Sequence, residues 1–386
     1  MTNQEKRDPA AGSAAAVDSV VAVDPFAMKG IGNDDPLEES GSTNESGDVN
    51  APASGDTKAS ASGDVNAPAS SDMNPSAAPE TSGETGIRQQ PRISVVIPTL
   101  NAEKYLPRLL KRLLAQTAEA EIIVIDSGSK DNTVSVVQQA AGKDPGRIRL
   151  IQIPGEQFDH GGTRDYALRQ SGGDYVMFLT QDALPVDKHC IENLLKGFSQ
   201  PDIAGVYGRQ IAFPGAAPYE KLTRQFNYPN QGRVWREQDI PRYGVKSYFF
   251  SNTCSMYRRD IYEKAGGFDR PIITNEDMLM AARLIHQGYA LAYVPEAAVY
   301  HSHNNTLLQD YKRNVKIGYV MRQYSDRLTG AQADSEGMRM VRFVGKELIR
   351  ERHFLSLGAF CMHAAVKLAG NRAGKTRRKR EEKNGK

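Results

Sequence analysis

The chain contains 386 residues, of which 25% are charged and 39% hydrophobic, and its formal net charge is +3. These values are ordinary for a soluble chain with room for two or three domains. Three cysteines, Cys190, Cys254 and Cys361, lie far apart without a CxxC pair, which argues against a disulfide framework or a zinc ribbon and fits a reducing compartment. We find neither a signal-peptide pattern after Met1 nor a run of about 18 apolar residues, so we predict a cytoplasmic protein without a spanning helix.

The net charge hides an uneven distribution along the chain. Residues 1–90 carry 5 basic against 15 acidic side chains, and Phe26 is their only aromatic residue. The nonapeptide SGDVNAPAS occurs there twice, at 46–54 and 62–70. Such a segment has too little apolar surface to offset its conformational entropy by burial. We therefore predict a disordered acidic tail over residues 1–90 and a folded chain that begins near Ile93.

Beyond this tail, short apolar strands alternate with helical patterns. The predicted strands are residues 94–97, 122–125, 148–153 and 175–179. Leucines spaced three and four residues apart over 106–114 predict the first helix, with Asn101 as its N-cap. The alternation predicts a parallel sheet, in which ligands bind beyond the carboxyl ends of the strands.

Polar residues stand at these predicted strand ends. Thr99 and Asn101 follow the first strand, and Asp126 follows the second, directly before the SGS tripeptide that contains Ser129. The Asp126 carboxylate suits hydrogen bonds to a nucleobase imide or to ribose hydroxyls, but Asp at such a turn is equally common as a helix cap or an Asx turn. The residues alone leave both alternatives open.

Three further residues are candidate metal ligands, each on its own grounds. Asp182 follows the run YVMFL, at a strand end where a hard divalent cation can bridge a carboxylate and a diphosphate. His301 and His303 follow the apolar stretch 291–299, and the HxH spacing on an extended chain places both imidazoles on one side. The alternatives are that Asp182 is a turn carboxylate and that the two histidines bind no metal. For the histidines taken alone, we favour the alternative in which they bind no metal.

Two acidic residues and a glycine pair complete the candidates. Glu276 and Asp277 precede a helical pattern that ends near Gly288, so they suit either the positive end of a helix dipole or general-base catalysis. The HGGT segment places Gly161 at a helix start, with Arg164 directly after the segment. This arrangement suits a phosphate group, although a glycine pair by itself is a weak signal.

Taken in chain order, these segments resemble a known family. VVIPTLN, IIVIDSGSKDNT, FLTQDALP, NEDM and a strand that ends in HSHN resemble the family 2 glycosyltransferases over about residues 92–325. The strings QFDHGGTRD, FFSNTCSMYRR and VYHSHNNTL resemble the bacterial rhamnosyltransferase branch of that family. The resemblance implies an enzyme with an α/β, Rossmann-like GT-A fold and a mostly parallel central sheet.

The resemblance also implies a role for each matched residue. In relatives, the PTxN turn and the strand-end aspartate bind the nucleotide, which places Thr99, Asn101 and Asp126 around a thymine or uracil base and its ribose. Four more residues are expected to line the same donor site: Ser129, Gly161, Arg164 and Gln181.

The family's DxD element, which holds a metal against the donor diphosphate, falls on residues 180–182 and implies Mg²⁺ or Mn²⁺ as cofactor. Thr180 stands at the first acidic position, so Asp182 remains the one acidic ligand and a weaker metal affinity is expected. The late histidine that completes the site in relatives matches His301 best, with His303 as its substitute.

The family's ED motif falls on Glu276 and Asp277, and its general base aligns with Asp277. This implies a single inverting displacement in which Asp277 takes the proton of an acceptor hydroxyl. The rhamnosyltransferase branch implies dTDP-β-L-rhamnose as donor, an α-L-rhamnoside as product, and a saccharide or lipid-linked glycan acceptor in cell-surface polysaccharide synthesis. Asp165 departs from relatives, which commonly have Asn there, and a carboxylate beside a diphosphate is repulsive unless Arg164 or Arg169 compensates.

Three alternative functions were compared with this one. A sugar nucleotidyltransferase needs a glycine-rich loop with Arg after the first strand, where this chain has PTLN, so we reject it. A catalytically weak or inactive nucleotide-sugar-binding protein is favoured by the missing acid at Thr180 and opposed by the intact NED motif. A family 2 transferase that uses another donor sugar is the third alternative.

The same reasoning predicts the domain organisation. Residues 91–325 form the catalytic domain, with a nucleotide-binding half at 91–200 and an acceptor half at 201–325, and a helical extension covers 326–386. Within the acceptor half, five aromatic residues either stack on sugar faces or belong to the core: Tyr219, Phe226, Tyr228, Trp235 and Tyr243.

The C-terminal extension pairs an apolar segment with a basic tail. Helical character extends over 338–368, and Lys367–Lys386 carries 9 basic against 2 acidic residues. This composition suits either peripheral contact with an anionic inner membrane surface or a packed helix followed by a solvated charge run. Because no aromatic residues interleave with the basic ones, we predict no nucleic-acid binding.

Overall fold

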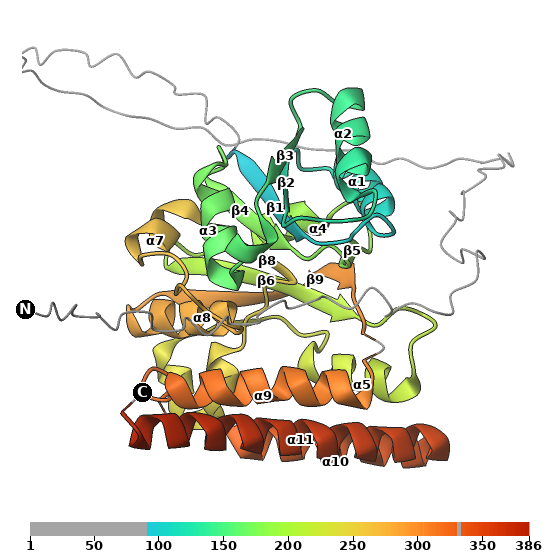
Figure 1. The fold of residues 1–386 in the computed structure, drawn as a ribbon, viewed down its shortest axis with the longest axis vertical. Coiled ribbons are helices and arrows are strands. Elements are labelled where there is room, and N and C mark those ends of the chain that lie inside the picture. The colour runs from blue at the N-terminus through green and yellow to red at the C-terminus, as the bar shows by residue number, and fades with distance from the viewer. Residues whose placement is uncertain (1–90, 304, 330–332, 386) are drawn as a thin grey trace, which may run out of the picture. The chain divides into compact units, whose positions relative to one another are not determined.

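The computed structural model describes residues 91–303, 305–329 and 333–385 (Figure 1). The predicted tail over residues 1–90, with its repeat, lies outside the described residues. Within them the chain forms one nine-stranded sheet with helices on both faces. The strands are β1 (Ile93–Thr99), β2 (Glu121–Asp126), β3 (Ile148–Gln152), β4 (Tyr175–Leu179), β5 (Leu184–Pro185), β6 (Ile203–Ile211), β7 (Arg233–Trp235), β8 (Cys254–Arg258) and β9 (Ala290–Tyr300).

The sheet order is β3-β2-β1-β4-β8-β6-β9-β5, and β7 pairs with β9 outside this path. The four strands predicted from the sequence are present and pair in parallel. Strand β8 is antiparallel to its neighbours β4 and β6, β9 again runs parallel to β6, and the short strands β5 and β7 are antiparallel to β9. The carboxyl ends of β1, β2, β4, β6 and β9 therefore lie along one edge of the sheet, where the candidate residues are.

Alternation along the buried strands divides the core into two layers. Val95 and Ile97 of β1 pack on one face, and Val96 packs on the other. The first face is covered by α1 (Leu106–Leu114), α2 (Thr133–Lys143) and α4 (Cys190–Lys196), and the second by α3 (His160–Arg169), α7 (Arg259–Lys264) and α8 (Glu276–His286). Strands buried on both faces are typical of parallel sheets covered by helices.

The first helix covers the predicted residues 106–114, but its N-cap differs from the prediction. Its N-cap is Tyr105, so the prediction that Asn101 caps it is wrong. Asn101 instead has a left-handed backbone with φ 52°, and its side-chain carbonyl accepts a hydrogen bond from the Lys130 N–H at 2.9 Å. The residue cannot cap a helix that starts five positions later, because it connects the loop after β1 to the loop after β2.

The C-terminal part is helical, as expected, but in separate pieces. They are α9 (Leu307–Gln323), α10 (Ala333–Arg350) and α11 (Phe354–Lys383), whereas α5 (Pro218–Asn227) and α6 (Ile240–Tyr243) lie earlier, between β6 and β8. The helical stretch predicted over 338–368 is broken by the turn at 351–353. Figure 1 shows α9 between the sheet domain and α11.

Helices α9 and α11 approach each other closely because glycines face each other across the contact. A Cβ atom on Gly374 would lie 2.0 Å from the Val315 carbonyl oxygen, and one on Gly318 would lie 2.1 Å from the Asn371 carbonyl oxygen. Among the described residues, we find no helix with the length and apolar character needed to cross a membrane.

Candidate active site

The loop after β2 is shaped by Asp126. This carboxylate is 1% exposed and accepts hydrogen bonds from the N–H groups of Gly128 (3.1 Å) and Ser129 (3.0 Å), while the Ser129 hydroxyl donates to its other oxygen. The Ser129 hydroxyl in turn accepts from the Asn101 N–H at 2.8 Å. Asp126 therefore forms the Asx-type turn that the sequence left as an alternative, and its contact with a nucleobase stays a prediction.

Thr99 and Gln181 hold the neighbouring turns together. The Thr99 hydroxyl donates to the Ile125 carbonyl at 3.3 Å, and the Gln181 amide pairs with both backbone groups of Leu100, at 2.9 and 3.2 Å. The loop after β4 is thereby tied to the loop after β1. These bonds explain both residues structurally, and their roles in donor binding stay predictions.

The structure brings Asp182, His301 and His303 together, and we call them the metal triad. Asp182 Oδ2 lies 3.5 Å from His301 Nε2 and 3.7 Å from His303 Nδ1. Candidate ligand atoms of the three residues all lie within 4.8 Å of one another, which is the spacing of a shared cation site. Among the described residues, this is the one group of three or more His, Cys, Asp or Glu side chains with that geometry.

The protonation states of the metal triad suit a cation. Burial opposes ionisation of Asp182, but His301 and His303 hold the pKa of this carboxyl well below its usual range. Burial lowers the pKa of both histidines, and for His303 the neighbouring His301 lowers it further. At neutral pH the triad therefore presents one carboxylate and two neutral imidazoles, the form in which these groups bind metals.

Gln210 orients His301 through a hydrogen bond to Nδ1, the ring nitrogen that faces away from Asp182. Its Nε2 donates to the Tyr228 hydroxyl (2.5 Å) and to the Ser251 hydroxyl (2.9 Å), so its Oε1 acts as acceptor for Arg224 and for His301 Nδ1, the latter at 2.8 Å. This network assigns the imidazole proton to Nδ1. The Nε2 lone pair of His301 then faces Asp182, as a second-shell partner of a metal ligand arranges it.

The two acids at the start of α8 have different surroundings. Glu276 is 5% exposed and lies 3.2 Å from Arg164 Nη1 and 3.2 Å from the Asn252 side-chain amide. Asp277 is less buried and accepts hydrogen bonds from the N–H groups of Asn252 (3.1 Å) and Met278 (2.8 Å). The loop before β8 therefore holds both carboxylates through a single residue, Asn252.

The pKa values of the two acids are pushed apart. Burial raises the pKa of Asp277 to about 7, and the negative charge of Glu276 contributes to the rise. Burial also opposes ionisation of Glu276, but Arg164 and His160 lower its pKa below the usual value. Two neighbouring carboxyls with divergent pKa values are typical of a general base beside a structural charge.

The HGGT segment is tightly packed. Gly161 is buried, and a Cβ atom there would lie 2.4 Å from the Asp269 carbonyl oxygen, so α3 needs a glycine for its approach to the loop after α7. Arg164 is 7% exposed and committed to Glu276. These contacts explain both residues through packing and ion pairing, and their binding of a donor phosphate stays a prediction.

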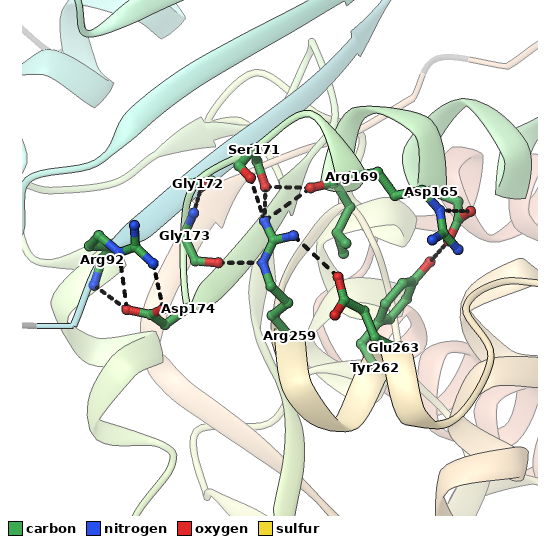
Figure 2. Close-up of polar contacts among 12 residues, drawn as sticks. Arg92, Asp165, Arg169, Ser171, Gly172, Gly173, Asp174, Arg259, Tyr262 and Glu263 are labelled. Carbon is green, nitrogen blue, oxygen red and sulfur yellow. Dashed lines mark hydrogen bonds and ion pairs between the residues drawn. The ribbon is translucent and has the colours of Figure 1, made fainter.

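Asp165 is compensated where it stands. It is 1% exposed, accepts from the Tyr262 hydroxyl at 3.1 Å, and pairs with Arg169 at 3.1 Å and Arg270 at 3.2 Å. Figure 2 shows Asp165 and Arg169 on α3 and Tyr262 on α7, beside Arg259, which donates to carbonyls of the α3–β4 connection. Asp165 is therefore paired with Arg169, one of the two arginines considered, and its effect on a donor diphosphate stays a prediction.

Residues that the sequence did not single out also reach the site. The pKa of Arg313 on α9 is lowered by burial and by Arg224, against the opposing charges of Asp310, Asp182 and Asp277. The positive charge of Arg313 therefore interacts with the carboxylates of Asp182 and Asp277. Gln210, Arg224, Asn252 and Arg313 belong to no spacing pattern, so only the fold identifies them.

Residues 201–325 contribute to a recess, but few of their aromatic faces are free. Tyr228 and Trp235 are each 4% exposed, so the core alternative holds for them, and Phe226 packs on Phe343. A recess of about 550 Å³ opens beside Gln210, and its lining includes Arg209, Lys221, Arg224, Gln225 and Asn230. Three cations in one recess suit an anionic ligand.

Comparison with known proteins identifies the family of this chain. The sequence profile of glycosyl transferase family 2 matches residues 94–266. The O-antigen chain rhamnosyltransferase RfbN of Salmonella typhimurium is 38% identical over 267 residues, which cover 68% of this chain and 83% of that protein. The O-antigen chain rhamnosyltransferase WbaN of Salmonella anatum is 35% identical over 269 residues, with the same two coverages.

A solved structure supports the fold. The mannosyltransferase PcManGT of Pyrobaculum calidifontis, in complex with GDP-Man and Mn²⁺, superposes with a TM-score of 0.52 at 17% identity. The match covers 74% of this chain and 88% of that protein. The identity is too low to transfer residue roles, so this likeness concerns the GT-A architecture alone.

Proposed function

The chain belongs to glycosyl transferase family 2 and is a glycosyltransferase, and we propose that it transfers L-rhamnose from dTDP-L-rhamnose with inversion at the anomeric carbon. The donor sugar rests on the two Salmonella relatives, which are both described as rhamnosyltransferases. The observation that carries the mechanism is that the metal triad lies at the same sheet edge as the loop before β8, where the Asn252 N–H donates to Asp277 and the Thr253 carbonyl accepts from the Thr180 N–H.

Asp277 is the proposed general base. It is partly exposed, whereas Glu276 is buried and paired with Arg164, so only Asp277 is open to an acceptor hydroxyl. Its pKa, raised to about 7 by burial and by Glu276, matches the requirement that a general base be poised near the working pH. The hydroxyl oxygen attacks the anomeric carbon as the proton passes to Asp277, and the bond from that carbon to the diphosphate breaks.

The metal triad is the proposed site of a divalent cation. One carboxylate oxygen and two neutral imidazoles fit Mn²⁺ better than Mg²⁺, because Mg²⁺ strongly prefers oxygen ligands. The chemistry that such a cation supplies when bound is neutralisation of the charge on the departing nucleoside diphosphate. Asp182, His301 and His303 would hold it, with Gln210 keeping the Nε2 lone pair of His301 directed at the site.

Arg224 and Arg313 are proposed to support the cation whose affinity Thr180 lowers. With threonine there, Asp182 is the one acidic member of the metal triad, and both imidazoles are neutral. Arg224 donates to Gln210, and the charge of Arg313 interacts with those of Asp182 and Asp277. Positive side chains near the metal triad favour the departing nucleoside diphosphate.

The acceptor is proposed to be a hydroxyl of a saccharide or lipid-linked glycan in cell-surface polysaccharide synthesis, reached at the cytoplasmic side of the cell membrane. The recess lined by Arg209, Lys221 and Arg224 is the proposed acceptor side of the site. A second candidate, a catalytically weak nucleotide-sugar-binding protein, is favoured by Thr180 alone and opposed by the raised pKa of Asp277, which binding without catalysis does not need.

A donor screen tests the proposal. Release of nucleotide is measured with dTDP-L-rhamnose, UDP sugars and GDP sugars, each with Mn²⁺, with Mg²⁺ and without metal. We expect turnover of dTDP-L-rhamnose that depends on Mn²⁺, and an α-linked product by NMR. Turnover of another donor alone would overturn the rhamnose assignment, a β-linked product would overturn inversion, and donor binding without turnover would support the second candidate.

A further inference from the structure

The outward face of α11 is apolar over its first half. Every residue of 354–369 that is exposed is apolar, and these residues recur every three or four positions along the helix. They are Phe354, Leu355, Gly358, Cys361, Met362, Ala365, Leu368 and Ala369, and we call them the outer stripe. Leu355 is 94% exposed, Phe354 63% and Met362 56%, so this face is uncovered in the structure. A contiguous exposed apolar patch of this kind marks an interaction surface.

The outer stripe is flanked by positive charge. Beyond Ala369 the exposed face of α11 becomes basic, with Arg372, Lys379 and Arg380, and the helix contains no acid before Glu381. On α10, which packs against α11, Arg342 and Lys346 are exposed. Within the described part of the chain, none of these five cations forms an ion pair. Uncompensated cations beside an apolar face complement an anionic lipid surface.

The length and composition of α11 determine how it can meet a bilayer. The helix has 30 residues, but its mean hydropathy is too low for it to cross a membrane, and no other described helix qualifies. Its opposite face is already used, since Gly370 and Gly374 pack on α9 and Phe360 packs on Leu222 and Val344. One apolar face, a basic flank and a covered back are the features of a helix that lies in the membrane interface.

The apolar end of α11 is connected to the active site. The Ser356 hydroxyl in its first turn accepts from the Tyr219 N–H at 3.1 Å, and the next residue of α5, Glu220, accepts from the His303 N–H at 2.8 Å. His363, two turns further along α11, lies 2.8 Å from Asp310 at the start of α9. The outer stripe and the metal triad are therefore linked through two consecutive residues of α5.

We propose that the outer stripe docks in the plane of an anionic membrane surface, with α11 lying along that surface and the active site held beside it. This inference extends the proposed function. It rests on that function for the role of the membrane contact, because a lipid-linked acceptor glycan is presented at such a surface. The apolar side chains insert at the level of the lipid headgroups, and the basic residues of α10 and α11 contact the anionic headgroups.

The native cysteines allow a direct test with the full chain. Cys361 belongs to the outer stripe and is exposed, whereas Cys190 and Cys254 are buried. A polarity-sensitive fluorophore on Cys361 should shift to shorter wavelength on vesicles of phosphatidylcholine and phosphatidylglycerol, and a nitroxide in the lipid should quench it. We expect little change on phosphatidylcholine alone or at high salt, since the screening of surface charge weakens the attraction. An unchanged spectrum on anionic vesicles would overturn the proposal.

Variants separate the contribution of the outer stripe to vesicle binding from that of the rest of the surface. F354D/L355D changes only exposed side chains and should weaken vesicle binding more than about tenfold, given the apolar area withdrawn from the bilayer. Tyr166→Asp, a substitution of a 45% exposed aromatic residue on α3, is the matched control and should bind like the unaltered chain. If F354D/L355D instead abolishes a dimer seen by light scattering while vesicles are not bound at all, the stripe is a contact between two copies and the proposal fails.

Activity distinguishes this inference from the proposed function. Both F354D/L355D and the unaltered chain should turn over a water-soluble acceptor at the same rate, but only the unaltered chain should be stimulated when the acceptor is embedded in anionic vesicles. Vesicle binding without any transfer would leave the membrane contact standing and overturn the proposed reaction. Equal stimulation of both proteins would overturn a role of the stripe in presenting the acceptor.

Discussion

The β2 end and the β9 end of the active-site edge are built from interactions of very different range along the chain. At the β2 end, Asp126 is bonded to Gly128 and Ser129, two and three positions away. At the β9 end, His301 is bonded to Gln210, 91 positions earlier, and faces Asp182 in the loop after β4. The first end is a property of a short loop, and the second is a property of the whole sheet.

This difference also separates the electrostatics of the two ends. Asp126 accepts hydrogen bonds from backbone N–H groups that are present in any chain that forms this turn. The metal triad and the two acids of α8 depend on groups that the fold brings together from distant positions, with Glu276 paired with Arg164 and Asp277 accepting from the Asn252 N–H. Substitutions at the β9 end should therefore alter pKa values and metal binding at a distance, whereas substitutions at the β2 end should have local effects.

The largest expected effect follows from removal of the proposed base. Asp277→Asn should lower kcat by about 10²–10⁴-fold, the usual contribution of general-base catalysis, while the Kd for nucleotide stays nearly unchanged. Single-turnover transfer rates and calorimetric binding of dTDP measure the two quantities. Unaltered turnover would remove Asp277 from the mechanism, and lost dTDP binding would show that it acts on the donor.

A smaller effect is expected from the residue behind the metal triad. Gln210→Leu removes the acceptor for His301 Nδ1, so the imidazole can rotate or change tautomer, and Mn²⁺ affinity should fall about 10–100-fold. Manganese binding is measured by electron paramagnetic resonance, with Gln225→Leu in the same recess as control. If the two variants bind Mn²⁺ equally well, Gln210 has no part in positioning the ligand.

The change of kcat with pH near neutrality should be smaller than the effects of these two substitutions. Because the pKa of Asp277 is raised to about 7, the base form is lost as pH falls through that value, and kcat should drop about tenfold per pH unit below it. Glu276→Gln removes a negative charge that raises this pKa, so the acidic limb should move to lower pH. A limb that moves upward or does not move would contradict the coupling of the two acids.

The smallest effect is expected at the β2 end. Asp126→Asn keeps an oxygen that can accept from Gly128 and Ser129, so the turn should survive and the melting temperature should change little. The loss of a carboxylate that accepts hydrogen bonds from the nucleotide sugar should raise the KM for that substrate by roughly fivefold without lowering kcat. This factor corresponds to the free energy of about one hydrogen bond. A fall in kcat as large as that of Asp277→Asn would remove the contrast between the two ends.

Sequence reasoning succeeded where the signal is continuous along the chain. The four predicted strands are present, because apolar β-branched runs need no partner to be identified. It failed at Asn101, whose side chain bonds across to Lys130 instead of to the helix that follows, and it treated two C-terminal helices as one helical stretch. In both cases a contact or a turn outside the local pattern decided the outcome.

The residues of the site divide in the same way. By itself, the sequence determined which polar groups follow the strands, because strand ends and turns obey short-range sterics and hydrogen bonding. Only the tertiary structure decided that Asp182 meets His301 and His303, that Gln210 sets the tautomer of His301, and that the charge of Arg313 on α9 interacts with Asp182 and Asp277. Burial and Coulomb interactions act through space and depend on distance in the folded chain, so their consequences for pKa and metal binding exist only once the sheet has brought these residues to one edge.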